Sequence, residues 1–232
     1  MSGLLHFSEH TLQEFALIFM AVVYLLRIKW LFSFKKVGER QASTGLTGTS
    51  KGKGILYSWA AIAMPWTMES ARNKIFFYTQ FVIFHLGVVA AILLSFLIPY
   101  APKVLESEFV TVIIQIFIGG AFLVGFGRII RRITSMYIRA ISSPDDYFSL
   151  ILLTAWFGFA FFAVPNNYQQ GETILLVFFL LTAFFLMYVP FSKISHYLYY
   201  PFSRFWFGRS MGHRGVYPLR RGAKTGGIKY GN

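Results

Sequence analysis

Two histidines, His85 and His196, are the only ones expected at membrane depth and are the residues best suited to carry chemistry. His85 stands inside the apolar segment from Ile75 to Ile98, and His196 follows the one from Thr173 to Val189. An ionisable ring at membrane depth is costly, so it is by default a functional hypothesis. The other three histidines are expected in solvated regions outside the membrane: His6, His10 and His213.

Two imidazoles on separate helices have the chemistry of an axial ligand pair for haem iron. In such a pair the neutral Nε2 binds the metal, while a carbonyl or hydroxyl accepts a hydrogen bond from Nδ1–H. Aromatic side chains near both histidines would cover the porphyrin faces: Phe81, Phe84, Tyr197 and Tyr199. The same pattern also fits histidines that only make hydrogen bonds between helices, and the residues alone leave both interpretations open.

A shared iron would require both histidines to reach nearly the same depth. His85 precedes Pro99 by 14 residues, which is about 21 Å of straight helix, whereas His196 follows Gly171 by 25 residues, about 37 Å. The fifth helix must therefore begin outside the membrane, tilt or bend, and Pro190 supplies a place for a bend.

The composition predicts a polytopic membrane protein. Of the 232 residues, 56% are hydrophobic and only 13% are charged, which a soluble domain rarely tolerates. The apolar segments are too long and continuous for barrel strands, so we expect an all-α bundle of five transmembrane helices. The five segments run from Thr11 to Phe34, Ile75 to Ile98, Phe109 to Ile130, Phe148 to Val164 and Thr173 to Val189.

The positions of Lys and Arg predict the orientation of these helices. Of the 22 basic residues, 21 fall in three regions that share one side if the N-terminus is outside; Lys103 is the exception. By the positive-inside rule that side, with the C-terminus, is cytoplasmic. The formal charge of +13 thus follows the membrane topology, and we predict no nucleic-acid partner.

Two domains are expected, a five-helix membrane cytochrome b domain over residues 1–207 and a basic cytoplasmic tail over 208–232. The tail has no core of its own, and we expect a cytoplasmic subunit, rather than lipid, to order it. A cytoplasmic loop over 36–73 contains a Gly/Ser/Thr-rich run, Ser43–Gly54, which should be flexible unless a partner orders it. The following segment, Ile55–Met68, is too short to span and predicts an interfacial anchor with Trp59 and Trp66.

Several kinds of chemistry find no support in the sequence. The chain has no cysteine, which excludes disulfides, iron–sulfur clusters and thiolate zinc sites within it. No carboxylate lies at mid-depth, and Asp145 and Asp146 are expected to cap the fourth helix.

The third helix carries small residues that allow close helix packing or leave room for a macrocycle: Gly119, Gly120, Ala121, Gly125 and Gly127.

Four stretches, taken together and in order, resemble a known family. They are Pro65–Arg72, Phe84–Val88, Ser143–Leu150 and Pro190–His196. On these residues the chain resembles the membrane cytochrome b subunits of the respiratory nitrate reductase gamma-subunit family. Within that family it is most similar to membrane subunits of heterodisulfide-reductase-like complexes, including the one associated with dissimilatory sulfite reduction.

The resemblance implies five helices, an external N-terminus and b-type haems held by the second and fifth helices. His85 and His196 match the ligand pair of the haem nearer the cytoplasm. The second pair in nitrate reductase relatives would fall around Ser95 and Phe178, where this chain has no histidine. The resemblance therefore implies one haem b. Basic groups at the cytoplasmic boundary suit its propionates, and Lys193 and Arg132 are candidates, although ordinary snorkelling also explains both.

The expected function is electron transfer within a respiratory complex of the prokaryotic cytoplasmic (inner) membrane. The chain would link a quinone or menaquinol pool to a cytoplasmic iron–sulfur subunit of the heterodisulfide-reductase-like or nitrate-reductase-beta-like kind, without converting the substrate itself. Other membrane or periplasmic cytochrome subunits are further partners that the resemblance implies. The alternatives are a haem-less membrane anchor and, with less support, a small transporter.

Overall fold

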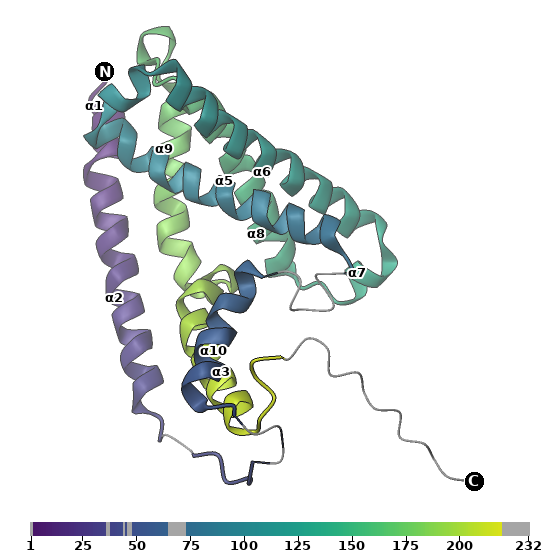
Figure 1. The fold of residues 1–232 in the computed structure, drawn as a ribbon. Helices are drawn as coiled ribbons and strands as arrows, with labels where there is room; N and C mark the ends of the chain where they lie inside the picture. The colour runs from purple at the N-terminus through teal and green to yellow at the C-terminus, as the bar shows by residue number, and fades with distance from the viewer. Residues whose placement is uncertain (1, 36–37, 44, 46–47, 65–72, 220–232) are drawn as a thin grey trace. The chain divides into compact units, whose positions relative to one another are not determined.

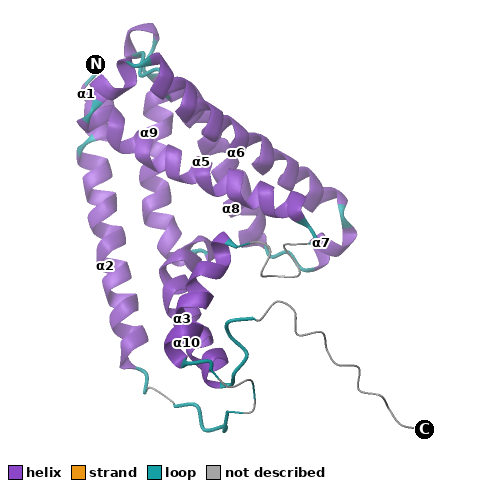
Figure 2. Cartoon of the chain, viewed as in Figure 1, coloured by secondary structure: helices purple, strands orange, loops and turns teal. Residues whose placement is uncertain are grey.

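The computed structural model describes residues 2–35, 38–43, 45, 48–64 and 73–219. These residues form helices and connecting turns, without strands (Figures 1 and 2). Contacts divide the chain into two units. Unit 1 contains Met1–Phe34 and Phe76–Ser195, and unit 2 contains Lys35–Ile75 and His196–Asn232. Residues 65–68 of the predicted interfacial segment lie outside the described residues, as does the whole of the first family-like stretch, Pro65–Arg72.

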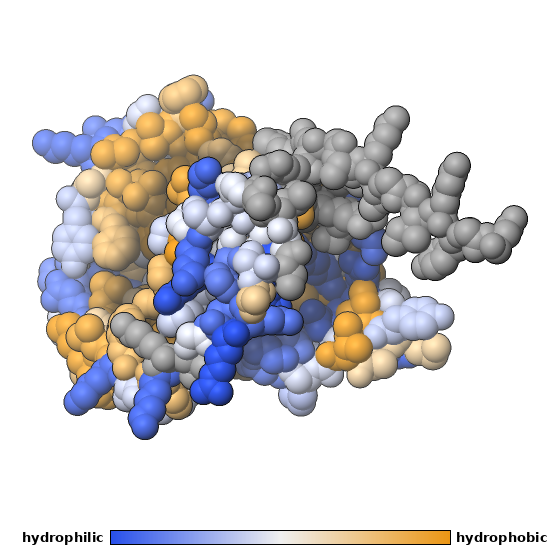
Figure 3. Space-filling view, turned by 60° about the horizontal axis from the view of Figure 1, so that its bottom comes forward, coloured by the Kyte–Doolittle hydropathy of each residue, from blue (hydrophilic) through white to orange (hydrophobic). Residues whose placement is uncertain are grey.

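Five helical segments of the described chain are long and apolar enough to cross a membrane, which confirms the predicted number. The first spanning segment combines the short helix α1 with α2. The fourth spanning segment begins at Pro144, four residues before the apolar segment predicted from the sequence, which starts at Phe148. Large hydrophobic side chains remain exposed on these helices, and Figure 3 shows hydrophobic residues in broad areas of one face. The chain is therefore a multi-pass membrane protein. The spans comprise α1 (Gly3–Glu9) with α2 (Thr11–Ser33), α5 (Ile75–Tyr100), α6 (Glu108–Thr134), α8 (Pro144–Ala163) and α9 (Thr173–Tyr188) continued by the 3₁₀ turn η5 (Val189–Phe191).

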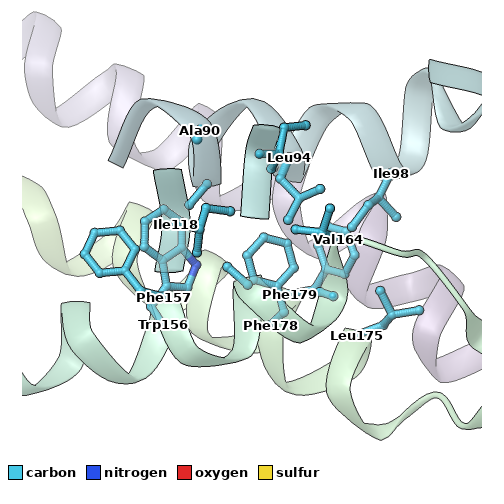
Figure 4. Packing of buried hydrophobic residues seen from close by; sticks show 14 of the residues in the cluster. Ala90, Leu94, Ile98, Ile118, Trp156, Phe157, Val164, Leu175, Phe178 and Phe179 are labelled. Carbon is cyan, nitrogen blue, oxygen red and sulfur yellow. The ribbon is translucent and has the colours of Figure 1, made fainter. Parts of the chain in front are cut away.

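Aliphatic and aromatic side chains together fill the core of unit 1 where α5, α6, α8 and α9 meet (Figure 4). The Phe157 ring is fully buried and packs edge-to-face on Phe84, with 5.3 Å between ring centroids. The buried indole of Trp156 on α8 donates from Nε1 to Thr182 Oγ1 on α9, at 2.8 Å. This bond satisfies the one polar atom of a large apolar ring, so α8 and α9 are held together without an unpaired donor.

Small residues set the closest approach between spanning helices. A Cβ atom built on Gly87 of α5 would lie 2.1 Å from the Cβ of Ala121 on α6. One built on Gly125 would lie 2.5 Å from Thr154 Oγ1 on α8. The packing role predicted for the small residues of the third span is thus confirmed at Ala121 and Gly125, whereas Gly127 faces open space.

A buried amide joins α2 to α9. Gln13 Nε2 donates to the carbonyl oxygen of Phe179 at 2.7 Å and to that of Ser8 at 3.1 Å. Interhelical hydrogen bonds of this kind contribute about 0.6–2 kcal/mol in membranes. The bond therefore fixes which part of α9 faces α2.

Unit 2 is built on an antiparallel helix pair, α3 (Lys51–Ala60) and α10 (His196–His213), called here the α3–α10 pair. The two backbones meet through glycine. A Cβ on Gly54 would lie 2.2 Å from the Gly208 carbonyl oxygen, and one on Gly212 would lie 2.3 Å from that of Ser50. Small residues four apart, Ser50, Gly54 and Ser58, thus face the Gly208-x-x-x-Gly212 motif of α10.

The contacts of α3 with α10 correct the prediction made for the run Ser43–Gly54. They also show where the predicted tail boundary at residue 208 falls in the structure. The run Ser43–Gly54 was predicted to be flexible without a partner, but its last four residues form the first turn of α3, with Gly54 buried. The predicted tail boundary at 208 falls within α10, which continues to His213. Lys51–Gly54 of the loop and residues 208–213 of the tail are therefore helical, because their small residues allow the two backbones to meet.

Polar contacts extend the packing of unit 2 beyond the helices. The Glu39 carboxylate accepts a hydrogen bond from Ser210 Oγ at 2.6 Å and lies 3.1 Å from Arg214 Nη2. The Ser210 bond, with the Arg214 charge, holds the pKa of Glu39 below its ordinary value. His213 Nε2 lies 2.9 Å from the Gln41 carbonyl oxygen. The chain before α3 is therefore tied to the end of α10.

Replacing Gly212 with leucine should loosen the α3–α10 pair. Overpacking of this kind costs about 1–3 kcal/mol, which corresponds to roughly 5- to 150-fold faster local opening. Hydrogen exchange of the α3 and α10 amides would measure it. Gly52→Ala is the matched control, because a Cβ at Gly52 meets nothing within 4 Å. Unchanged exchange in Gly212→Leu would contradict the glycine contact.

Candidate functional site

His85 is held on α5 in one orientation by the helix itself. Its Nδ1 lies 2.7 Å from the Phe81 carbonyl oxygen, one turn earlier. A carbonyl oxygen can only accept, so Nδ1 carries the proton and Nε2 carries the lone pair of the neutral ring. The half-buried ring packs against Phe81 at 4.2 Å and lies near Phe84, at 6.1 Å between centroids. This is the tautomer and support that a metal-binding imidazole needs.

His196 begins α10 rather than ending the fifth span. Helix α9 ends at Tyr188, and the 3₁₀ turns η5 and η6 (Lys193–Ser195) follow, with Pro190 fully buried. The helix is thus interrupted at Pro190, where the sequence offered a place for a bend. His196 comes five residues after the span that ends at Phe191, and its side chain is exposed. His85 belongs to unit 1 and His196 to unit 2, and their pairing stays a prediction.

Lys193 and Arg132, the predicted propionate ligands, both lie near Asp146. Lys193 Nζ lies 2.9 Å from Asp146 Oδ2 and 2.8 Å from Ser143 Oγ. Arg132 Nη1 donates to Ser142 Oγ at 2.5 Å and lies 3.9 Å from the same carboxylate. The Arg132 Nε is buried without a hydrogen-bond partner among the described residues. These contacts join α6, α8 and η6, whereas a role toward a cofactor stays a prediction.

Asp145 and Asp146 have separate structural roles at the start of α8. The Asp146 carboxylate accepts from the backbone N–H of Ser143 at 2.8 Å, so its predicted capping role is confirmed. Asp145 instead accepts a hydrogen bond from the Tyr188 hydroxyl on α9 and, at 3.3 Å, from the Lys193 backbone N–H. Adjacent carboxylates thus connect the start of α8 to α9 and to the turn that precedes His196.

Arg128 and Arg131, on the last turns of α6, are site residues that the sequence reasoning missed. The Arg128 guanidinium lies 4.9 Å from the centre of the Phe84 ring, and that of Arg131 lies 4.3 Å from the Phe77 ring. Neither forms an ion pair with a carboxylate in the described part of the chain. Arg128 is half-buried, and Phe84 is the neighbour of His85 in the chain. The positive charge of Arg128 is therefore separated by one aromatic ring, that of Phe84, from the turn of α5 that carries His85.

The remaining histidines do not join this region. The rings of His6 and His10 lie 4.8 Å apart between centroids and are tilted by 37°, near the start of the first span, and His10 also packs edge-on to Tyr100. No group of three or more His, Cys, Asp or Glu side chains in the described ranges could hold a metal ion. Haem iron needs only one or two side chains, because the porphyrin occupies four positions. The role of His85 as a haem ligand stays a prediction.

Removing the Asp146 carboxylate should destabilise unit 1 more than removing the Lys193 charge. Asp146→Ala deletes the cap of α8 and should cost about 1–2 kcal/mol. Lys193→Met should cost about 0–1 kcal/mol, because the Lys193 side chain is 61% exposed. Thermal unfolding in detergent, followed by circular dichroism, compares the two. An equal or larger loss in Lys193→Met would contradict the capping role.

The comparisons with known proteins give no relative for this chain. No family model, no curated protein and no solved structure matches it.

Proposed function

We propose that the chain is a haem b electron-transfer subunit of a quinone-linked respiratory complex, with His85 and His196 as axial ligands. The observation that carries the proposal is the hydrogen bond from His85 Nδ1–H to the Phe81 carbonyl, 2.7 Å long, on a helix that spans a membrane. It directs the lone pair of Nε2 away from the helix backbone, as ligation requires. The stretches that resemble nitrate reductase gamma subunits support the same assignment.

In this proposal the chain binds one haem near the cytoplasmic side, with its N-terminus outside and its C-terminus in the cytoplasm. Bound haem supplies one-electron chemistry, while the protein fixes the ligands and limits access of water. The partners would be a quinone or menaquinol pool and an iron–sulfur subunit of the heterodisulfide-reductase-like or nitrate-reductase-beta-like kind. The membrane would be the prokaryotic cytoplasmic membrane. The chain itself would transfer electrons without converting the final substrate.

Arg128 extends the proposed site beyond the candidates that the sequence offered. Lys193 has Asp146 as its ion-pair partner, and Arg132 has Ser142 and Asp146 nearby. Arg128 lies on the Phe84 ring beside His85 without such a carboxylate among the described residues. A propionate has the charge that this guanidinium would bind. We therefore assign Arg128 the first place among the propionate ligands, ahead of Lys193 and Arg132.

A haem-less anchor is the alternative function. It is favoured by the position of His196, which follows the fifth span instead of lying within it. Such an anchor would hold the iron–sulfur subunit at the membrane and carry no electrons. The absorbance of the purified protein distinguishes the two, because only a haem protein shows a Soret band that shifts on reduction.

His85→Ala and His196→Ala should each abolish haem binding, because each removes one of two axial ligands. The pyridine haemochrome assay gives the haem content per chain, and we expect one haem in the parent protein. His6→Ala and His213→Ala, which lie outside the proposed pair, should retain it. Full haem content in both ligand variants would overturn the proposal and leave the chain as an anchor.

Arg128→Gln should keep the haem but lower its midpoint potential, since a nearby positive charge favours the reduced form. A tenfold fall in the reduction equilibrium constant corresponds to about 59 mV for one electron. Redox titration of the haem absorbance measures this shift. Arg139→Gln removes the same charge from an exposed position on the short helix α7 (Met136–Ala140) and should shift the potential less. Equal shifts in both variants would contradict the assignment of Arg128.

A further inference from the structure

The start of the first spanning segment carries two histidines one helical turn apart. The His10 backbone N–H donates to the His6 carbonyl oxygen at 3.2 Å, so the two residues occupy successive turns. Side chains at positions i and i+4 of a helix share one face. His6 is exposed, His10 is half-buried, and their ring centres lie 4.8 Å apart. The helix thus places two imidazoles side by side on an accessible face of unit 1.

The separation of the two rings suits a shared metal ion. One nitrogen from each ring, bound at about 2.0–2.1 Å with an angle of about 90–110° at the ion, places the ring centres about 4.5–5.2 Å apart. The observed 4.8 Å falls inside this range. Rotation of each ring about its Cβ–Cγ bond moves the nitrogens but leaves the ring centre almost in place, so the helix sets this distance. Two histidines four residues apart are also the ligand pair of helical zinc motifs.

The ring nitrogens of this pair are not used elsewhere in the part of the chain that the structure describes. His85 and His213 each place a ring nitrogen beside a backbone carbonyl oxygen, at 2.7 and 2.9 Å. In contrast, no described residue forms a hydrogen bond or an ion pair with the imidazole of His6 or His10. Their side-chain contacts are with each other and with the Tyr100 ring. A nitrogen of each ring is therefore available to an ion.

The charge at this end of unit 1 favours a cation. The ends of the spans meet here in three stretches, residues 2–14, 100–108 and 164–173 (Figure 1). By sequence they contain five glutamates and a single basic residue. Glu14 lies one turn after His10, on the same face of the helix. An excess of negative charge raises the local concentration of divalent cations.

Helix α1 is held in position before any ion binds. The Leu5 side chain is fully buried in the core of unit 1, and the Ser2 backbone N–H donates to the Glu172 carboxylate at 2.6 Å. The Tyr100 ring packs edge-on against the His10 ring, with 5.5 Å between centroids. Ligands that are already positioned lose little conformational freedom on binding, which favours affinity.

We propose that His6 and His10 bind one divalent transition-metal ion, Zn(II) or Cu(II). Imidazole suits both ions, and Cu(II) binds a given nitrogen site more tightly than Zn(II). Water completes the coordination, because no group of three His, Cys, Asp or Glu side chains forms in the described ranges. The ion joins α1 to α2 across the junction at His10 and so stabilises the start of the first span. Neither histidine belongs to the proposed haem pair, so the two proposals stand or fall separately.

Zinc titration of the full-length protein in detergent tests the site, after purification without a histidine tag and removal of metal by a chelator. We expect one zinc per chain. His6→Ala leaves one imidazole and should weaken binding roughly tenfold or more. His10→Ala with Thr11→His is the matched control, because it keeps two histidines but moves one of them by about 100° around the helix. It should weaken binding as much as His6→Ala does.

Two further measurements test the ligands and the effect on the fold. Pulsed EPR of the Cu(II)-loaded protein should detect two bound imidazoles in the parent and one in His6→Ala. At a free zinc concentration 100 times the Kd, hydrogen exchange of α1 through openings that break the site should slow about 100-fold. Absence of zinc binding overturns the proposal. Binding that is unchanged in both His6→Ala and the displaced-histidine variant also overturns it, because the ion then lies elsewhere.

Discussion

A peptide group in the hydrocarbon core of a bilayer has no water to bond, and most of this structure follows from that constraint. Each spanning segment satisfies its own backbone as a helix. The few polar side chains inside the spans then need partners on neighbouring helices. The Gln13 side-chain amide donates a hydrogen bond to the Phe179 carbonyl of α9, and the Trp156 indole donates one to the Thr182 hydroxyl. In unit 1 these hydrogen bonds specify which helices meet, while apolar packing alone would allow several arrangements.

Charged groups of unit 1 gather where the spans end, and there they act mainly as connectors. Asp146 caps α8 and also forms an ion pair with Lys193 from the turn after α9. The Asp145 carboxylate accepts a hydrogen bond from the Tyr188 hydroxyl. Arg128 and Arg131 differ from these residues because they rest on phenylalanine rings instead of carboxylates. The two kinds of contact thus distinguish the basic residues that join helices through carboxylates from those that pack on aromatic rings.

The five spans and the cap of α8 were predictable from sequence, because a long apolar run and a Ser-Pro-Asp-Asp start are local signals. The interruption of the helix at Pro190 was predictable for the same reason. The contact between α3 and α10 was not predicted, because its glycines and serines form no apolar pattern and the two helices are far apart in the chain. The position of Arg128 beside Phe84 depends on how α5 and α6 align, which the Gly87–Ala121 contact sets. For the site, the sequence indicated His85 as a ligand, but only the structure revealed its bond to Phe81.

The two halves of the α3–α10 pair are separated by most of the protein, and this has a consequence for biosynthesis. Ala60 and His196 are 136 residues apart, with four spanning helices between them. At the usual rate of translation, about 5 to 20 residues per second, α3 leaves the ribosome about 7 to 27 s before α10. During that interval its Gly54 face has no counterpart from its own chain. The α3–α10 pair therefore cannot form before the last span has been synthesised, and a nascent chain that stops before α10 leaves α3 without its counterpart.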